Sequence, residues 1–297
     1  MRIFEHNFVA DKAKIRRRAA ARQGFLTQYA AKFAERTCAY AYEDRFLHID
    51  TKGKRKMKLL IIRHGDPDYS IDSLTEKGRR EAALLAERLK NTKIDAFYVS
   101  PLGRAKATAE YTLKAMNRTA EECPWLREFH APIKDPVTGE ERIPWDLLPE
   151  YWTKTEEFYS RELWHTVPIM AESNVISEAM RVYKGIDDII LRHGYRREGN
   201  IYRAERPNRE TVALFCHFGV ECVMLGHILG ISPVVLWHGF CAAPTSVTVL
   251  TTEERREGIA ALRMNAFGDT GHLYAGGEEP AFAARFCETF DSDERHD

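Results

Sequence analysis

The sequence predicts an α/β fold, a three-layer sandwich in which a mostly parallel central sheet carries helices on both faces, together with an inserted lid segment. Three short apolar runs support this fold, at 59–62, 94–99 and 212–216, because consecutive apolar residues are typical of strands buried on both faces. Segments with helical spacing lie between and after these runs. Strands that alternate with helices indicate parallel strands joined by helical crossovers.

The predicted helices follow the strands in order. Thr75 can cap a helix over 76–90, in which apolar residues recur on one face. Helical spacing is also present over 105–116. A largely apolar helix is predicted over 220–229, and Gly230 can end it. These helices supply the outer layers of the sandwich.

The remaining segments have a different composition. Residues 131–208 are aromatic, rich in charge and interrupted by Pro and Gly, which predicts an inserted lid rather than sheet. Segments 245–251 and 259–264 predict two late strands. We expect the large aromatic residues of the lid to form its own small core, and the alternative is that they line a recognition surface. They are Trp145, Tyr151, Trp152 and Trp164.

The charge of the chain is uneven although its net charge is zero. Residues 1–56 hold fourteen Lys and Arg against six Asp and Glu, and the rest of the chain is acidic. We therefore divide the chain into a basic N-terminal extension, 1–56, and a domain over 57–297 with an insertion at about 131–208. We expect the extension to be loosely packed. Either it lies outside the native domain, which we favour, or it is an arm that docks elsewhere.

Composition also argues against several classes of protein. No apolar run reaches the roughly eighteen residues that a membrane helix needs, so no membrane partner is expected. The cysteines form no CxxC pairs, which argues against a zinc site and a disulfide framework. We expect reduced thiols in a cytoplasmic protein that has no metal or other cofactor. The acidic main body argues against nucleic acid as a partner, and nothing in the sequence indicates the oligomeric state.

The run at 59–62 leads directly into the tripeptide Arg-His-Gly at 63–65. Because ligands bind beyond the carboxyl ends of strands in open α/β sheets, a cation and an imidazole stand where a substrate would bind. The same tripeptide recurs at 192–194, where it ends a segment of helical spacing. There the glycine can terminate a helix, and the two basic residues favour its negative end. We predict a functional site at the first copy and a structural role for the second.

Two other strand ends carry related side chains. The run at 94–99 leads to Arg104 in the first turn of a helix, where a cation is unfavourable unless an anion such as phosphate binds there. The run at 212–216 leads to His217, again just before a predicted helix. Three strand ends that each finish on a cationic or imidazole side chain would build one pocket for a dianion.

Three segments together resemble the histidine phosphatase, or phosphoglycerate mutase-like, superfamily. They are LLIIRHGDPDYSIDSLTEKGRREA, SPLGRAKATAE and VALFCHFGVECVMLGHILG. The resemblance covers about residues 57–130 and 209–230 and leaves 1–56 and 131–208 unmatched. It implies that His64 is the nucleophile and that Arg63, Arg104 and His217 bind the phosphoryl group.

The resemblance also implies a proton donor for the leaving group. Glu128, in the phrase Trp-Leu-Arg-Glu, stands at the matching position, and Asp135 is the next candidate. Two positions depart from the family pattern. Ser70 stands where many members have asparagine and can still donate a hydrogen bond, and Phe218 follows the second histidine where glycine is common. The backbone N–H of Phe218 could still face the phosphate.

These residues predict a phosphatase that hydrolyses a small phosphomonoester through a phosphohistidine, without a metal because two arginines supply the positive charge. A phosphoglycerate mutase is the first alternative, although 131–208 lacks the basic, proline-rich stretch of those enzymes. A catalytically inactive binding protein for phosphate compounds is the second, and the complete residue set argues against it. A nucleic-acid or membrane tether formed by 1–56 is weaker still, because its aromatic residues show no stacking pattern.

Overall fold

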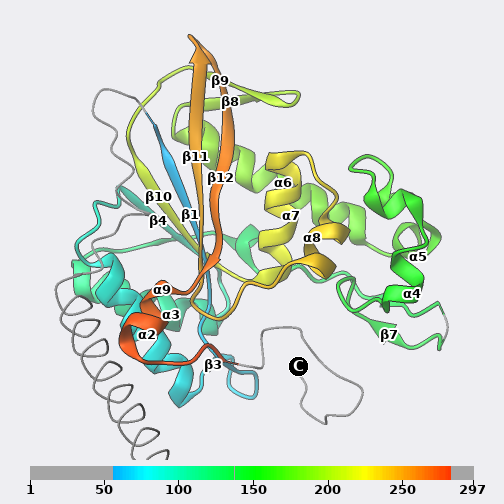
Figure 1. The fold of residues 1–297 in the computed structure, drawn as a ribbon, viewed down its shortest axis with the longest axis horizontal. Coiled ribbons are helices and arrows are strands. Elements are labelled where there is room, and N and C mark those ends of the chain that lie inside the picture. Colours follow the sequence, from blue (N-terminus) through cyan, green and yellow to red (C-terminus); the bar gives the residue numbers. More distant parts are fainter. Residues whose placement is uncertain (1–55, 137, 282–297) are drawn as a thin grey trace, which may run out of the picture. The chain divides into compact units, whose positions relative to one another are not determined.

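The computed structural model describes residues 56–281 except residue 137, and every structural statement below refers to these residues. The predicted basic extension, apart from Lys56, lies outside them. A central sheet runs through the described part of the chain (Figure 1). Its strands are β1 (Lys58–Arg63), β4 (Ala96–Val99), β5 (Glu121–Glu122), β8 (Tyr195–Glu198), β9 (Ile201–Ala204), β10 (Thr211–Cys216), β11 (Val247–Arg256) and β12 (Ile259–Asp269).

The order of these strands is β5-β4-β10-β1-β11-β12-β9-β8. The first four run parallel to one another, and every pairing from β1–β11 onward is antiparallel. The predicted α/β fold is confirmed, and the sheet is mixed. Its antiparallel half is larger than the sequence suggested because the two late strands extend to Arg256 and Asp269. Their charged, partly exposed ends conceal the strand pattern in the sequence.

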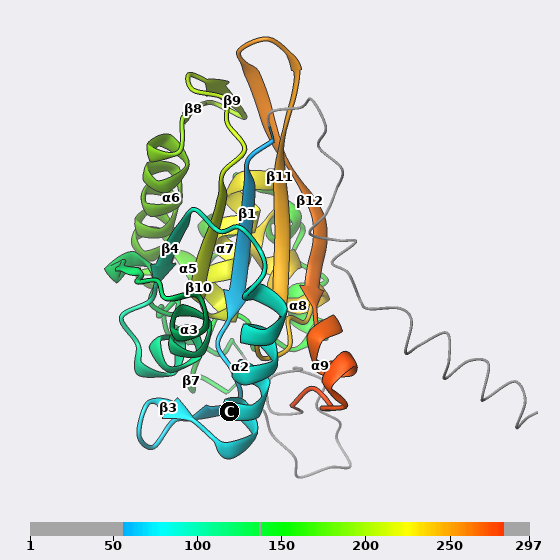
Figure 2. The ribbon, with the colours of Figure 1, turned by 90° about the vertical axis from the view of Figure 1, so that its left-hand side faces the viewer.

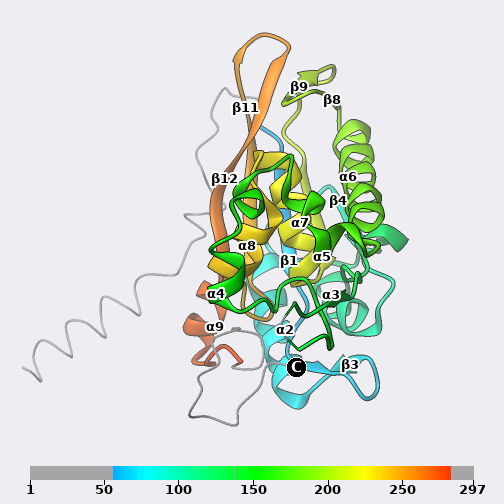
Figure 3. The same cartoon turned by 90° about the vertical axis from the view of Figure 1, so that its right-hand side faces the viewer.

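Helices cover both faces of the sheet. Figure 2 shows α2 and α3 in front of β1, and Figure 3 shows α7 and α8 in front on the opposite side. The helices of the first group are α2 (Glu76–Leu89), α3 (Gly103–Met116) and α9 (Gly271–Gly276). Those of the second group are α6 (Val175–Arg192), α7 (Phe218–Leu229) and α8 (Pro233–Gly239). The three-layer arrangement follows from β1 itself, because its side chains alternate between the two faces and are buried on both.

The helix boundaries agree with the sequence signals. The Thr75 hydroxyl accepts the N–H of Gly78 and caps α2, and the residues that α2 buries lie on its predicted apolar face. Gly230 ends α7 with a φ of 73°, a left-handed conformation that glycine adopts without strain. The second Arg-His-Gly tripeptide ends α6, where His193 is the C-cap and Gly194 has a φ of 93°. The predicted position of this tripeptide at the end of a helix is confirmed.

The segment 131–208 combines short elements with a long helix and a hairpin. Its first part packs beside α8 and contains β6 (Ile133–Lys134), β7 (Glu141–Arg142), α4 (Pro149–Trp152) and α5 (Pro168–Ala171). After α6, the hairpin β8–β9 joins the central sheet through β12. The expectation that this segment contains no sheet is therefore wrong for the hairpin. Its charged residues, common on edge strands, hide a pattern in which Tyr195 and Tyr202 are buried and their neighbours are less buried.

Candidate active site

Three strand ends meet at one edge of the sheet. β1 and β10 are parallel neighbours with Arg63 opposite Cys216, and β10 and β4 are parallel neighbours with Phe215 opposite Val99. The residues that follow these strands, His64, His217 and Ser100, therefore enter the same space. All three are almost fully buried.

The ring of His64 is held in one tautomer. Its Nδ1 lies 2.7 Å from the carbonyl oxygen of Gly65, which can only accept a hydrogen bond, so Nδ1 carries the proton. The unprotonated nitrogen is then Nε2. Burial, with the charges of Arg63 and Arg104, holds the pKa of His64 well below its ordinary value. The ring is thus neutral and has a nucleophilic lone pair at physiological pH.

The two arginines are held by backbone contacts. Nη1 of Arg63 donates to the carbonyl oxygen of Ala242 over 2.6 Å, and its guanidinium lies 5.5 Å from the ring centroid of Phe218. Arg104 is the second residue of α3, where Thr108 Oγ1 donates to its carbonyl oxygen over 2.8 Å. The same Oγ1 accepts the N–H of Gly65 over 2.9 Å. Thr108 therefore ties the turn after His64 to the helix that carries Arg104.

A carboxylate from the neighbouring loop contacts Arg104. Asp72 accepts from Arg104 Nη1 and from the N–H of Gly103, each over 2.6 Å. Burial alone would raise the pKa of Asp72, but the hydrogen bonds from Gly103 and Arg104 outweigh it and lower that pKa. Asp72 has a φ of 45°, so the loop turns sharply to reach the helix N-terminus. The ion pair holds the Arg104 side chain in place before any anion binds.

His217 is the N-cap residue of α7 and is fully buried. Its Nε2 lies 2.7 Å from Oγ of Ser100, and that hydroxyl also accepts the N–H of Leu102. Burial, with the charges of His64, Arg104 and Arg63, holds the pKa of His217 well below its ordinary value. Its Nδ1 has no hydrogen-bond partner among the described residues. Phe218, the next residue, begins α7, and its side chain is buried.

Glu128 reaches the same helix N-terminus from the segment after α3. It follows a short 3₁₀ turn, Pro124–Leu126, and its carboxyl group accepts the backbone N–H groups of Phe129, Gly219 and Val220 over 2.7, 3.2 and 2.9 Å. Burial raises the pKa of Glu128 and outweighs the three N–H groups and Arg104, which lower it. A carboxyl group with a raised pKa, on which the charges of Arg63 and Arg104 act, is suited to donate a proton.

Two other candidates from the sequence lie elsewhere. Ser70 is exposed on the loop between β2 (Pro67–Asp68) and β3 (Ser73–Leu74), where its N–H and hydroxyl both bond to the Asp68 carboxylate. Asp135 is buried in the β6–β7 hairpin and pairs with Arg142 over 2.8 Å. The structure thus brings together His64, Arg63, Arg104, His217 and Glu128, with Phe218 at the start of α7, whereas the hydrogen bonds of Ser70 go to Asp68 and the carboxylate of Asp135 pairs with Arg142.

Sequence reasoning missed three residues that support this arrangement. They are Asp72, Ser100 and Thr108. Thr108 lies four residues after Arg104, a spacing that allows its hydroxyl to reach the Arg104 carbonyl. This contact could therefore have been predicted from the sequence. Ser100 directly follows β4, as His64 and His217 directly follow β1 and β10. Asp72 could not be found from the sequence, because its contact depends on the path of the loop.

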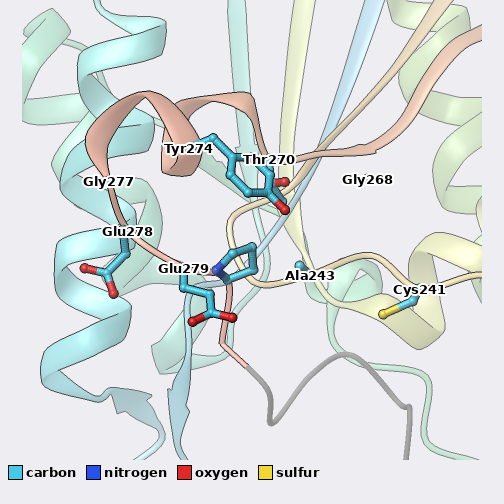
Figure 4. Close-up of a pocket in the computed structure, with 9 residues that line it drawn as sticks. Cys241, Ala243, Gly268, Thr270, Tyr274, Gly277, Glu278 and Glu279 are labelled. Atoms are coloured by element: carbon cyan, nitrogen blue, oxygen red, sulfur yellow. The ribbon is translucent and has the colours of Figure 1, made fainter. Parts of the chain in front are cut away.

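A pocket of about 580 Å³ borders this site. Figure 4 shows Glu278 and Glu279 on one side of it and Cys241 on the other. Ala242, whose carbonyl oxygen accepts from Arg63, stands between two residues that line the pocket, Cys241 and Ala243. Its described lining does not include the two histidines, the two arginines or Glu128. Within the same described residues no group of three or more His, Cys, Asp and Glu is arranged for a metal ion, and no helix is long and apolar enough to span a bilayer.

The known proteins that this chain resembles include phosphatases and phosphoglycerate mutases. The chain is 25% identical to phosphoserine phosphatase 1 of Hydrogenobacter thermophilus over 231 residues, which covers 73% of this chain and 96% of that protein. It is 31% identical to a probable phosphoglycerate mutase of Photorhabdus laumondii over 99 residues, or 29% of this chain and 46% of that protein. Among solved structures, a phosphoserine phosphatase mutant from Entamoeba histolytica in complex with phosphoserine shares the fold, with a TM-score of 0.50 and 20% identity, over 73% of this chain and 99% of that chain.

A family model describes most of the domain. The model of the histidine phosphatase superfamily, branch 1, matches residues 59–265. This range begins in the strand before His64 and includes both predicted late strands. The chain therefore belongs to the histidine phosphatase superfamily, branch 1.

Proposed function

We propose that this protein hydrolyses a phosphomonoester through a phosphohistidine formed at His64. One observation carries the proposal. The buried, neutral ring of His64 bonds through Nδ1 to the Gly65 carbonyl, which leaves Nε2 as the nucleophilic nitrogen. The charges of Arg63 and Arg104 act on this ring. A neutral imidazole beside two such cations can attack a phosphoryl group whose oxygens the arginines neutralise.

In the first step, the Nε2 lone pair attacks phosphorus and the bond from phosphorus to the ester oxygen breaks. Glu128 donates its proton to that oxygen, so the leaving group departs as a neutral alcohol. His217 is neutral as well. Because Ser100 Oγ accepts from Leu102, its own hydroxyl hydrogen can go to Nε2 of His217. The ring proton of His217 then lies on Nδ1, where it can donate to a phosphoryl oxygen.

In the second step, water attacks the phosphohistidine. The Glu128 carboxylate takes a proton from the water, the water oxygen bonds to phosphorus, and the bond from phosphorus to Nε2 breaks. Inorganic phosphate leaves, and both His64 and Glu128 return to their initial protonation states. No atom of the enzyme is consumed.

Hydrolysis is favoured over mutase activity by the extent of the sequence matches. The match to a phosphoserine phosphatase extends over 73% of this chain. The matches to phosphoglycerate mutases extend over 20–33% of it. We therefore propose a small phosphorylated metabolite as substrate and take phosphoserine as the first compound to test.

The experiment combines turnover with detection of the intermediate. Purified protein is given phosphoserine, 3-phosphoglycerate and other phosphorylated metabolites, and phosphate release is measured. A reaction with the best substrate is stopped in alkali, which preserves phosphohistidine, and the site of modification is identified by mass spectrometry and phosphorus-31 NMR. We expect modification at Nε2 of His64. A labelled residue other than His64, or turnover that persists in His64→Ala, would refute the proposal.

A further inference from the structure

A side chain of the lid, Trp145, lies near Glu128, the proposed proton donor. Trp145 follows the β6–β7 hairpin and is partly buried. A β-carbon at position 219 would lie 2.6 Å from Cζ3 of Trp145 and 2.8 Å from Oε1 of Glu128. The edge of the indole and the carboxyl oxygen thus converge over the α-carbon of Gly219, and only glycine leaves room for both.

The position of Trp145 is fixed from several directions. Its ring packs against Phe129 and Trp237, with centroids 6.4 and 5.9 Å away. Trp237 in turn donates its indole N–H to the carbonyl oxygen of Gly219 over 3.1 Å. Trp237 therefore contacts both the Trp145 ring and the backbone of Gly219, whose N–H donates to Glu128.

The chain on either side of Trp145 is anchored as well. Arg142 pairs with Asp135 and with Asp146, over 2.8 and 3.1 Å, which ties the turn before and after Trp145 to the hairpin. The N–H of Leu147 donates to Nε2 of His238 on α8 over 3.2 Å. These contacts hold the indole over Gly219 without any bond from the indole to Glu128.

We propose that Trp145 is a positioning residue for Glu128: its indole covers the carboxyl group and keeps water from it, so that the group remains a proton donor at neutral pH. The inference rests on the proposed function, in which Glu128 is the acid. An apolar wall is required because the three backbone N–H groups bonded to Glu128 favour its ionised form. Removing the wall leaves those N–H groups and the arginine charges dominant, so the pKa of Glu128 falls.

Other charged or titratable groups also act on Glu128, and none of them is altered by a change at Trp145. They are Arg63 of β1, Tyr69 of the β2–β3 loop, Arg104 of α3, Arg181 of α6, Cys216 of β10, and Glu221 and Cys222 of α7. A shift in the pH profile of a Trp145 variant therefore reports on the indole.

The test measures kcat/KM against pH for Trp145→Ala and Trp145→Phe with phenyl phosphate and 4-nitrophenyl phosphate. Phenol is a poor leaving group that needs a proton, whereas 4-nitrophenol leaves without one. For phenyl phosphate, we expect the basic limb of the kcat/KM profile of Trp145→Ala to move to lower pH by about one unit. At pH values above that limb, kcat/KM should then be roughly tenfold lower than in wild type. We expect the pH profile of Trp145→Phe to lie near that of wild type, because phenylalanine restores an apolar wall. With 4-nitrophenyl phosphate, kcat/KM should change little in either variant.

Two controls separate the possible failures. Trp152→Ala removes another lid indole, which stacks on His238, while His238 keeps its bonds to Leu147 and Val234. Its basic limb should match wild type. Glu128→Gln tests the acid itself: if it affects both substrates equally, the acid assignment in the proposed function fails. If Glu128→Gln is selective but Trp145→Ala lowers both substrates without a shift in pH, the role of Trp145 is refuted.

A direct titration covers the case in which Trp145→Ala does not fold. Carbon-13 NMR of labelled glutamate carboxyl groups gives the pKa of Glu128 in wild type, in Trp145→Phe and in Trp145→Leu, with the resonance assigned from Glu128→Gln. We expect the pKa to fall in the leucine variant, which leaves a gap for water beside the carboxyl group. An unchanged pKa in that variant would overturn the proposal.

Discussion

The imidazole rings of His64 and His217 lie with their centroids 5.0 Å apart and their planes tilted by 56°. The chain brings them together because β1 and β10 are parallel neighbours in register, so the residue after each strand enters the same space. His193 belongs to an identical tripeptide but caps α6, and its ring nitrogens contact Glu210 and Tyr98. The same tripeptide thus stands in two structural settings, after a buried strand and at the end of a helix.

This contrast gives the first prediction. His64→Ala should abolish turnover while the protein stays folded, since the nucleophile is lost and the backbone hydrogen bonds of residue 64 to Cys216 and Thr245 do not involve the side chain. His193→Ala should keep nearly full activity and lose about 1 kcal/mol of stability with its hydrogen bonds. Phosphate release and thermal unfolding of both variants check this. Greater loss of activity at His193 would show that the wrong copy of the tripeptide has been chosen.

The strand ends were predictable because buried apolar runs show where core strands stop. His64, Arg104 and His217 could be placed together from those runs alone, since parallel neighbours carry their C-terminal residues to one edge. The contacts of Glu128 could not be predicted in this way, because they depend on how the lid and α7 pack. The loop path that turns Ser70 to Asp68 and brings Asp72 to Arg104 was equally hidden.

The second prediction concerns the proton donor. Glu128→Gln keeps the size of the side chain and removes the proton, so hydrolysis of an alkyl phosphate such as phosphoserine should slow by about 10²–10⁴-fold. Hydrolysis of 4-nitrophenyl phosphate should slow far less, because its leaving group is already stable as an anion. The ratio of the two rates is the measurement. An equal loss on both compounds would move the acid role to another carboxyl group.

The third prediction concerns metal ions and rests on Arg63 and Arg104, which in the proposed mechanism supply the charge that a metal would otherwise contribute. Treatment with EDTA should leave phosphatase activity unchanged. Vanadate should inhibit competitively, because its trigonal bipyramidal form resembles the phosphoryl group in transit and would bind the same cations. Activity that disappears with EDTA and returns with magnesium or zinc would contradict the mechanism.

The fourth prediction uses the pair of Asp72 and Arg104. Asp72→Asn keeps an oxygen for the N–H of Gly103 but removes a negative charge beside the proposed dianion pocket. Phosphate and vanadate should bind about two- to fivefold more tightly, and the gain should shrink at high salt because the Asp72 side chain is 44% exposed. Asp68→Asn makes the same charge change on the same loop, away from Arg104, and should have a smaller effect. Weaker phosphate binding in Asp72→Asn would show that holding Arg104 in place outweighs the charge.

The fifth prediction concerns Glu221, a buried acid of α7 to which the proposed mechanism assigns no step. Its carboxyl oxygens have no hydrogen bond of normal geometry among the described residues, although Thr248 and the charge of Arg63 act on it. Burial raises its pKa to about 7. The unfolded chain ionises this group at a pKa of about 4.3, so the folded state is disfavoured as pH rises from there to about 7. The cost above pH 7 is on the order of 3 kcal/mol.

Glu221→Gln stays neutral at every pH and should therefore be more stable than wild type at pH 8, with an advantage that shrinks towards pH 5. Urea unfolding at pH 5 and at pH 8 gives the free energy of unfolding of both proteins. The difference between the two proteins should be larger at pH 8 than at pH 5. Glu178 is also buried, but it has cationic partners. Its carboxylate pairs with Arg127 and Arg181 over 2.7 and 2.9 Å. Glu178→Gln should be less stable than wild type at pH 8, since two cations lose their partner. If Glu221→Gln is destabilised at pH 8 as well, attraction between Glu221 and Arg63 outweighs the cost of burying the charge, and Glu221 then supports the proposed phosphate-binding arginine as an ion pair.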